Sequence, residues 1–439
     1  MTTDQRATYA QVLAQPVFRT VFCTRILGIA ADTLRMVALS TLIFAATGSP
    51  LLAAVAFGIG FVPQAVGVVG LGALADRLRP RGLVVGGYAL EASAALTLVV
   101  WHPPVAAMLL IVACVALFTP VFAGATNRLI AASLTGDAYV LGRSLATVAS
   151  SAAQLLGLAV GAAAVALLSP VGALLVTAGA HALAAAWSRV GLPPDPARHE
   201  PVQGDPARHE PVQGDSALSP AEPGPVSSPA GPGSVPSPAE PGGAGTVRDS
   251  WAGTRALLAD RPVRTLLLAQ WLPPAVVTGA EALLVPYAER GGFPAGAAGA
   301  LLACSPLGMM LGDVAVARLL APATRERLVV PLVALLGVPL LAFAAQPRLP
   351  VAAVLLILAG AGYAYSLGLQ RRFLDAVPEP RRGHAFGLLA AGAMTCQGLG
   401  PVLFGLLAEA VSIGAAIALA GATVLALAAA LRPALRRAA

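Results

Sequence analysis

Ionisable residues lie inside long apolar stretches of this 439-residue chain, and these residues are the ones that could do chemistry. The stretch 18–45 holds Arg25, Asp32 and Arg35. On a helix Arg35 lies within side-chain reach of Asp32, and Arg25 lies two turns before it. A charge at the centre of a bilayer costs at least about 2.5–3.5 kcal/mol. The spacing therefore fits two interpretations: an ion pair that neutralises itself, or a proton-carrying Asp32 that responds to Arg35.

The composition places these residues in a membrane. The chain is 57% hydrophobic and 11% charged, whereas an ordinary soluble domain is about 45–50% apolar and about 25% charged. This excludes one large soluble globule, and it excludes disorder as the main state. We find no GxxxxGK[ST], HExxH or GxSxG motif and no metal-ligand spacing of His and Cys. We therefore expect no enzymatic activity, no cofactor and no metal site.

The elements that position the charges are helices that cross a bilayer, since such a helix needs about 20 mostly apolar residues. Turn residues such as Thr47-Gly48-Ser49-Pro50 and Ser169-Pro170 separate the stretches. The chain contains twelve of them: 18–45, 51–74, 83–101, 105–126, 139–167, 171–189, 264–288, 296–320, 328–345, 350–373, 384–409 and 413–431. We predict an all-α membrane protein of twelve transmembrane helices in two pseudo-symmetric bundles.

The basic residues fix an orientation. The loops that alternate to one side carry most of the Arg residues, and the other side carries only Arg290 and Arg348. Because basic loops stay in the cytoplasm, we predict a multi-pass protein of the plasma membrane with both termini cytoplasmic. The same placement, in short gaps between apolar runs, accounts for the basic balance without a nucleic-acid partner.

The chain divides into two related halves. We predict a first bundle over 1–190, a disordered linker rich in Pro, Gly and Ser over 191–255, and a second bundle over 256–439. Pro16-Val-Phe-Arg-Thr20 corresponds to Pro262-Val-Arg-Thr265 at an offset near 245. Such a repeat is typical of secondary transporters, in which the substrate path lies between the halves.

The repeat also relates two further carboxylates to the first helix. Glu281 lies deep in its stretch and corresponds to the position of Arg35, so the two side chains could meet across a central cavity. Alternatively, Glu281 faces water near Tyr287. Glu91, in the third stretch, is either the structural partner of an Arg or a proton carrier.

Two motifs resemble those of the major facilitator superfamily. The segment Gly72-Ala-Leu-Ala-Asp76-Arg77, followed by Arg81, resembles the signature loop of that family, with Arg79 where the family has a second Gly. The resemblance implies that Asp76 and Arg77 form a cytoplasmic latch between helices, as a breakable pair suits a two-state gate.

The second motif resembles the antiporter signature of the same superfamily. Gly157 and Gly161 keep its glycines, with Leu158 in place of its Pro, and the eleventh stretch has Gly400 and Pro401. Small residues of this kind let helices approach closely. The segments Thr47-Gly-Ser-Pro50 and Arg381-Arg-Gly-His-Ala-Phe-Gly387 resemble actinobacterial exporters of drugs and siderophores.

These observations lead to one expected function and two alternatives. We expect a monomeric secondary transporter that couples protons to the export of a small organic compound by alternating access. The alternatives are a nutrient importer of the same fold and a membrane sensor or receptor that does not transport. The sequence does not identify the substrate.

Overall fold

A computed structural model describes residues 8–134, 136–194 and 253–437 of the chain. Every regular element in these ranges is a helix, and the described part of the chain contains no strand. Ten helical segments are long and apolar enough to cross a membrane, and a shorter apolar helix covers Val329–Ala345. One of the ten, Ala152–Gly191, is broken at Ser169. The set therefore fits the twelve predicted stretches.

The helices of the first half are α1 (Tyr9–Ala14), α2 (Pro16–Thr47), α3 (Pro50–Gly58), α4 (Phe61–Arg77), α5 (Pro80–Trp101), α6 (Val105–Ser133) and α7 (Gly136–Gly191). Those of the second half are α9 (Arg261–Glu281), α10 (Leu284–Arg290), α11 (Ala297–Leu319), α12 (Pro322–Arg327), α13 (Val329–Leu341), α14 (Leu349–Ala361), α15 (Tyr365–Ala376), α16 (Arg382–Ala410) and α17 (Ile413–Arg437). Three short 3-10 helices complete them: η1 (Ala342–Ala345), η2 (Gly362–Ala364) and η3 (Glu379–Arg381).

Prolines explain where several spans are interrupted. A proline has no N–H for the carbonyl four residues earlier. Pro63 accordingly follows the break between α3 and α4, and Pro286 follows the break between α9 and α10. Pro170 keeps the preceding Ser169 out of the helical region, at φ 72° and ψ 166°. The second and seventh predicted stretches are thus two helices each.

Two predicted regions fall partly or wholly outside the described residues. The linker prediction 191–255 concerns mainly residues 195–252, which are not described, and residues 253–259 are already helical. The predicted gate loop begins inside α4, because that helix continues to Arg77 rather than ending near position 74. The side chains of Asp76 and Arg77, and the surroundings of Gly72, lie outside the description, so the latch remains a prediction.

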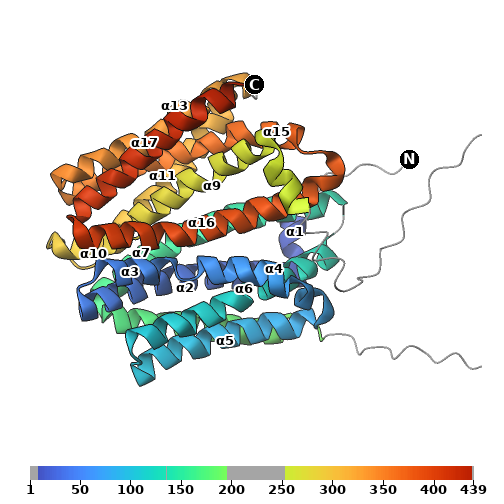
Figure 1. The fold of residues 1–439 in the computed structure, drawn as a ribbon. Coiled ribbons are helices and arrows are strands. Elements are labelled where there is room, and N and C mark those ends of the chain that lie inside the picture. The colour runs from blue at the N-terminus through green and yellow to red at the C-terminus, as the bar shows by residue number, and fades with distance from the viewer. Residues whose placement is uncertain (1–7, 135, 195–252, 438–439) are drawn as a thin grey trace, which may run out of the picture. The chain divides into compact units, whose positions relative to one another are not determined.

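The helices pack first within each half. In the first half α2 and α5 pack on α7, and α4 packs on α6. In the second half α9 packs on α16, α11 on α14, and α13 on α17. Figure 1 shows the blue-to-green helices of the first half beside the yellow-to-red helices of the second, with α16 next to α3 and α4. The halves also meet where α11 contacts α7 and where α10 contacts α2 and α3.

Equivalent glycines hold the corresponding helix pairs together. A Cβ atom at Gly157 of α7 would lie 2.6 Å from the carbonyl oxygen of Ala30 in α2. A Cβ atom at Gly400 of α16 would collide with the carbonyl oxygen of Ala275 in α9. Because real Cβ atoms do not approach this closely, each helix pair depends on the missing side chain. The two contacts are one packing device, repeated in both halves.

We expect Gly400→Val to destabilise the second half. The new side chain meets backbone that cannot rotate away, and overpacking of this kind typically costs about 1–3 kcal/mol. The matched control is Gly387→Val in the same helix, where a Cβ atom meets nothing within 4 Å. Thermal unfolding of the two purified variants compares them, and equal midpoints would contradict the packing role of Gly400.

Small residues also line the contact between the halves. A Cβ atom at Gly58 of α3 would lie 2.7 Å from the ring of Pro401 in α16. One at Gly405 would lie 3.0 Å from Ala54, and one at Gly299 of α11 would lie 2.7 Å from Ala162 of α7. The contact surface between the halves is therefore built from glycine, alanine and proline at these points.

Three hydrogen bonds join the halves at the end of the helices where α2 meets α3, which we call the Gly48 end. The hydroxyl of Ser49 donates to Oε1 of Glu409 over 2.5 Å, and the amide of Leu51 donates to the same oxygen over 3.2 Å. Arg290 donates to the carbonyl of Gly48 over 3.0 Å. Glu409 thus lies at the N-terminus of α3, where a helix favours an anion.

Candidate functional site

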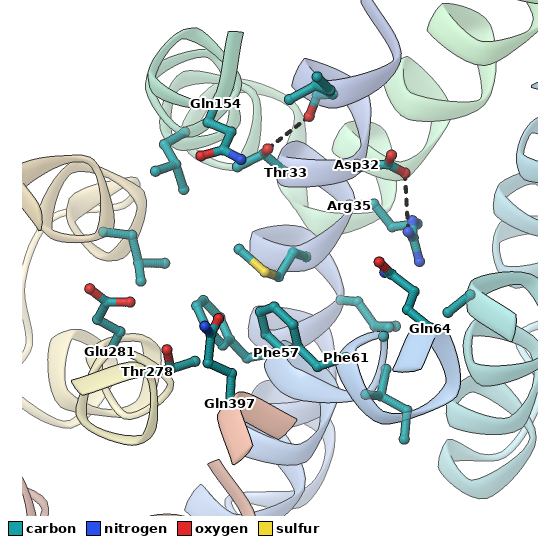
Figure 2. Close-up of a pocket in the computed structure, with 18 of the residues that line it drawn as sticks. Asp32, Thr33, Arg35, Phe57, Phe61, Gln64, Gln154, Thr278, Glu281 and Gln397 are labelled. Atoms are coloured by element: carbon teal, nitrogen blue, oxygen red, sulfur yellow. Dashed lines mark hydrogen bonds and ion pairs between the residues drawn. The ribbon is translucent and has the colours of Figure 1, made fainter. Parts of the chain in front are cut away.

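A cavity of about 490 Å³ lies between the two halves. The walls combine apolar side chains with carboxylates, amides and hydroxyls from α2, α4, α5, α6 and α7 on one side and from α9, η2 and α16 on the other. In Figure 2, Asp32 and Arg35 lie on one side of this cavity, and Glu281 and Thr278 lie on the other. The polar lining residues include Thr33, Gln64, Gln154, Thr278 and Gln397. This is the position expected for a substrate path between repeats.

The wall from the first half carries a compact charged cluster. Nη2 of Arg35 lies 3.1 Å from Oδ1 of Asp32 and 3.8 Å from Oε2 of Glu91. The side chain of Asp32 is 42% exposed, whereas those of Arg35 and Glu91 are 15% and 9% exposed. The cavity therefore reaches the cluster through Asp32. A single Arg holds two carboxylates that come from different helices, α2 and α5.

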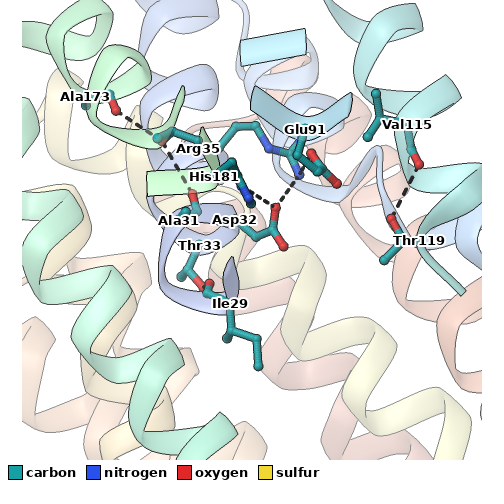
Figure 3. Close-up of polar contacts among 11 residues, drawn as sticks. Ile29, Ala31, Asp32, Thr33, Arg35, Glu91, Val115, Thr119, Ala173 and His181 are labelled. Carbon is teal, nitrogen blue, oxygen red and sulfur yellow. Dashed lines mark hydrogen bonds and ion pairs between the residues drawn. The ribbon is translucent and has the colours of Figure 1, made fainter. Parts of the chain in front are cut away.

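His181 completes the cluster, and sequence reasoning missed it. Its Nε2 lies 3.5 Å from Oδ1 of Asp32, and its side chain is 1% exposed. Figure 3 shows His181, Asp32, Arg35 and Glu91 together, and apart from this contact with Asp32 the ring nitrogens of His181 have no hydrogen-bond partner among the described residues. The available signal was its place in the middle of the predicted stretch 171–189, whose other ionisable residue is the terminal Arg189. Buried polar groups are normally hydrogen-bonded, so this imidazole is exceptional.

The charges of the cluster do not balance without a proton. Two carboxylates face one guanidinium, which leaves one negative charge when His181 is neutral. One added proton, on His181 or on Asp32, makes the cluster neutral, and a neutral cluster costs less inside a membrane. Ligand atoms of Asp32, Glu91 and His181 also lie within 4.8 Å of one another, an arrangement that could hold a metal. The guanidinium of Arg35 already occupies the position beside both carboxylates.

Glu281 stands apart from this cluster. It is the last residue of α9, and the hydroxyl of Ser305 in α11 donates to its Oε1 over 2.5 Å. It lines the cavity but forms no ion pair with Arg35, which the structure engages with Asp32 and Glu91. The expected pairing of Arg35 and Glu281 across the cavity is thus not made in this structure: the two side chains lie on opposite walls.

Three other predicted residues lie elsewhere. Arg25 donates from Nε to the hydroxyl of Ser150 in α7 over 3.3 Å, instead of joining Asp32. Arg81 donates to the carbonyl of Arg189 over 2.6 Å, at the end where α5 begins and α7 stops. Gly161 faces Leu34 of α2, one turn beyond Gly157. Arg25 and Arg81 thus connect helices of the first half.

The chain also matches a family model over most of its length. The model is that of the Major Facilitator Superfamily, and the match covers residues 21–374. The chain belongs to this superfamily. Membership makes it a multi-pass membrane transporter of small molecules rather than an enzyme, in agreement with the helices and the cavity. No curated protein matches it in sequence.

Solved structures of superfamily transporters share the fold. The nucleoside transporter NupG is 14% identical, with a TM-score of 0.64, covering 95% of this chain and 98% of its own. A bacterial homolog of the human lysosomal transporter Spinster is also 14% identical, with a TM-score of 0.65 and coverage of 96% and 97%. A POT family transporter in complex with 5-aminolevulinic acid is 9% identical, with a TM-score of 0.66 and coverage of 99% and 98%.

Proposed function

We propose that this protein is a proton-coupled exporter of a small organic compound that works by alternating access. One observation carries the proposal. The central cavity exposes Asp32, which belongs to a buried cluster whose charge becomes neutral when one proton is added. Such a group can take up a proton from the cavity when the cavity faces one side and release it when it faces the other.

The orientation in the membrane is part of the proposal. The Arg-rich loops place both termini in the cytoplasm of a plasma-membrane protein, so the Gly48 end faces the outside. The bonds of Gly48, Ser49 and Leu51 to the second half then close the outer side of the cavity. We further propose that one chain suffices, because its two halves enclose the cavity between them.

Within the first half, a change in the protonation of the cluster changes the contacts between the helices around it. Arg35 of α2 holds Glu91 of α5 and Asp32 of its own helix, while His181 approaches Asp32 from α7. Protonating Asp32 removes the negative charge that holds Arg35, which then has Glu91 as its remaining partner. This exchange of ion-pair partners gives the half two arrangements, as a two-state transporter requires.

Export predicts a measurable redistribution of solutes. Cells that produce the protein should hold less of at least one small organic compound than cells without it, and more of it should appear in the medium. A protonophore should remove the difference, because it removes the driving gradient. Mass spectrometry of cell extracts and media measures both. Unchanged solute levels with correctly inserted protein would contradict the transport role, and accumulation inside the cells would contradict export.

A further inference from the structure

The cavity wall of the second half holds a carboxylate, that of Glu281, with no basic partner among the described residues. Glu281 accepts one hydrogen bond, from Ser305, and takes part in no ion pair among the described residues. Within the described part of the chain, α13, α15, α16 and α17 pack on α9. Their Arg, Asp and Glu residues lie toward the ends of the membrane spans and are not among the cavity-lining residues; they are at positions 371, 372, 375, 382, 409, 432, 436 and 437.

The backbone around Glu281 adds to its negative field. Glu281 is the last residue of α9, and the carbonyl end of a helix carries partial negative charge. Pro286 cannot donate a hydrogen bond to the carbonyl of Ala282, which directly follows Glu281. A carboxylate at this end of a helix, inside a membrane, is stabilised by a positive charge placed in the cavity.

The ionisable side chains that line the cavity carry a net negative charge when the carboxylates are ionised. Its lining includes three carboxylates, on Asp32, Glu91 and Glu281, against one guanidinium, on Arg35. Arg35 is already bound to the first two carboxylates. The charge still unmatched on the second half is therefore that of Glu281, and a low-dielectric cavity strengthens its attraction for cations.

The remaining lining fits the apolar part of such a cation. Phe57, Phe61, Met36 and Met309 line the same cavity as Glu281, and Figure 2 labels the two phenylalanines among its walls. Aromatic rings attract cations through their faces, and methionine side chains adapt to irregular apolar shapes. The cavity volume of about 490 Å³ is within the usual range for small-molecule sites.

We propose that the cavity binds monovalent organic cations, with the amine or quaternary nitrogen beside the carboxylate of Glu281. The aromatic or aliphatic body of the ligand lies against Phe57, Phe61 and the methionines. This inference rests on the proposed function, since it names the class of compound that the exporter carries. It assigns the proton to the cluster at Asp32 and the substrate cation to Glu281 on the opposite wall.

Direct binding to the full-length protein tests the proposal. The purified transporter in detergent should bind tritiated tetraphenylphosphonium, and unlabelled phenyltrimethylammonium should displace it. The neutral tert-butylbenzene, which has the same shape as phenyltrimethylammonium, should not. Glu281→Gln should weaken the affinity for tetraphenylphosphonium at least about tenfold, because it removes the charge that the cation faces. Glu281→Asp should retain part of the affinity.

The matched control is Glu289→Gln. Glu289 carries the same charge on the same span but is exposed and outside the cavity lining. The Glu289→Gln variant should therefore bind tetraphenylphosphonium with the affinity of the unchanged protein. Equal displacement by the cationic and neutral compounds, or unchanged affinity in a folded Glu281→Gln, would overturn the cation site. A lack of tetraphenylphosphonium binding to the unchanged protein would do the same.

The outcome separates this inference from the proposed function. The protein could export a neutral or anionic compound in a way that a protonophore abolishes, yet not bind tetraphenylphosphonium. That result would support the proposed exporter function and refute its cation selectivity. Glu281-dependent binding of the cation without any solute redistribution would support the site and refute transport.

Discussion

Replacing Asp32 by asparagine should abolish uphill transport driven by a pH gradient while leaving passive exchange of substrate intact. Asparagine keeps the size of the side chain but cannot carry a negative charge or take up a proton. The cluster then has one carboxylate, on Glu91, and one guanidinium, on Arg35, so its charge is already balanced. A proton entering from the cavity then has no carboxylate at position 32 to neutralise. The pH gradient therefore no longer shifts the equilibrium between the two arrangements of the halves.

The measurement uses the exported compound in proteoliposomes. Accumulation against a gradient under an imposed pH difference should fall to the level of protein-free liposomes, whereas exchange between equal concentrations on both sides should persist. The control is Asp375→Asn, whose carboxylate pairs with Arg371 over 3.7 Å and is 71% exposed. Undiminished uphill transport by Asp32→Asn would refute the role of Asp32.

His181→Gln locates the proton within the cluster. Glutamine retains hydrogen-bonding capacity beside Asp32 but has no titratable nitrogen. If the proton is shared between His181 and Asp32, across the 3.5 Å that separates them, this variant should lose uphill transport like Asp32→Asn. Full coupling in His181→Gln would assign the proton to the carboxylate alone.

Linking Ser49 to Glu409 should stop transport completely. These residues join α3 to α16 at the Gly48 end, and alternating access requires that end to separate. The experiment replaces both residues by cysteine in a protein whose four native cysteines, all free in the structure, are changed to serine. A short bifunctional thiol reagent with a cleavable disulfide should reduce flux to background, and a reductant should restore it.

Two observations control this experiment. Each single cysteine variant, treated with the same reagent, should keep the flux that it has before treatment, because one thiol cannot join the halves. Gel mobility after proteolysis in the 195–252 segment should show the two halves joined only in the linked double variant. Normal flux through fully linked protein would show that the Gly48 end does not open during transport.

Most of the fold was predictable from the sequence because a bilayer imposes a length on each helix. The stretches 105–126 and 413–431 begin where α6 and α17 begin, and the two helices continue to Ser133 and Arg437, beyond the predicted ends. The break at Ser169-Pro170 was predicted, whereas the interruptions near Pro63 and Pro286 were not, although these prolines were visible. The apolar stretches continue through Pro63 and Pro286. Hydropathy alone therefore does not show where the helical hydrogen bonds of the backbone are interrupted.

The candidate site was predictable where it depends on one helix and not where it depends on several. The contact of Asp32 with Arg35 follows from their three-residue spacing. The approach of His181 depends on how α7 is rotated toward α2, and the local sequence does not specify that rotation. The repeat relates Arg35 to Glu281 by position, and the structure places these related positions on facing walls rather than in contact.

The small residues between the halves have a kinetic consequence. Side chains of glycine, alanine and proline lose almost no rotamer freedom when they are buried. Where Gly58 meets Pro401 and Gly299 meets Ala162, the surfaces can therefore part and meet again without trapped rotamers. We expect these contacts to add little to the energy barrier for separating the halves. The turnover rate should then be limited by the hydrogen bonds at the Gly48 end and by the charges in the cavity.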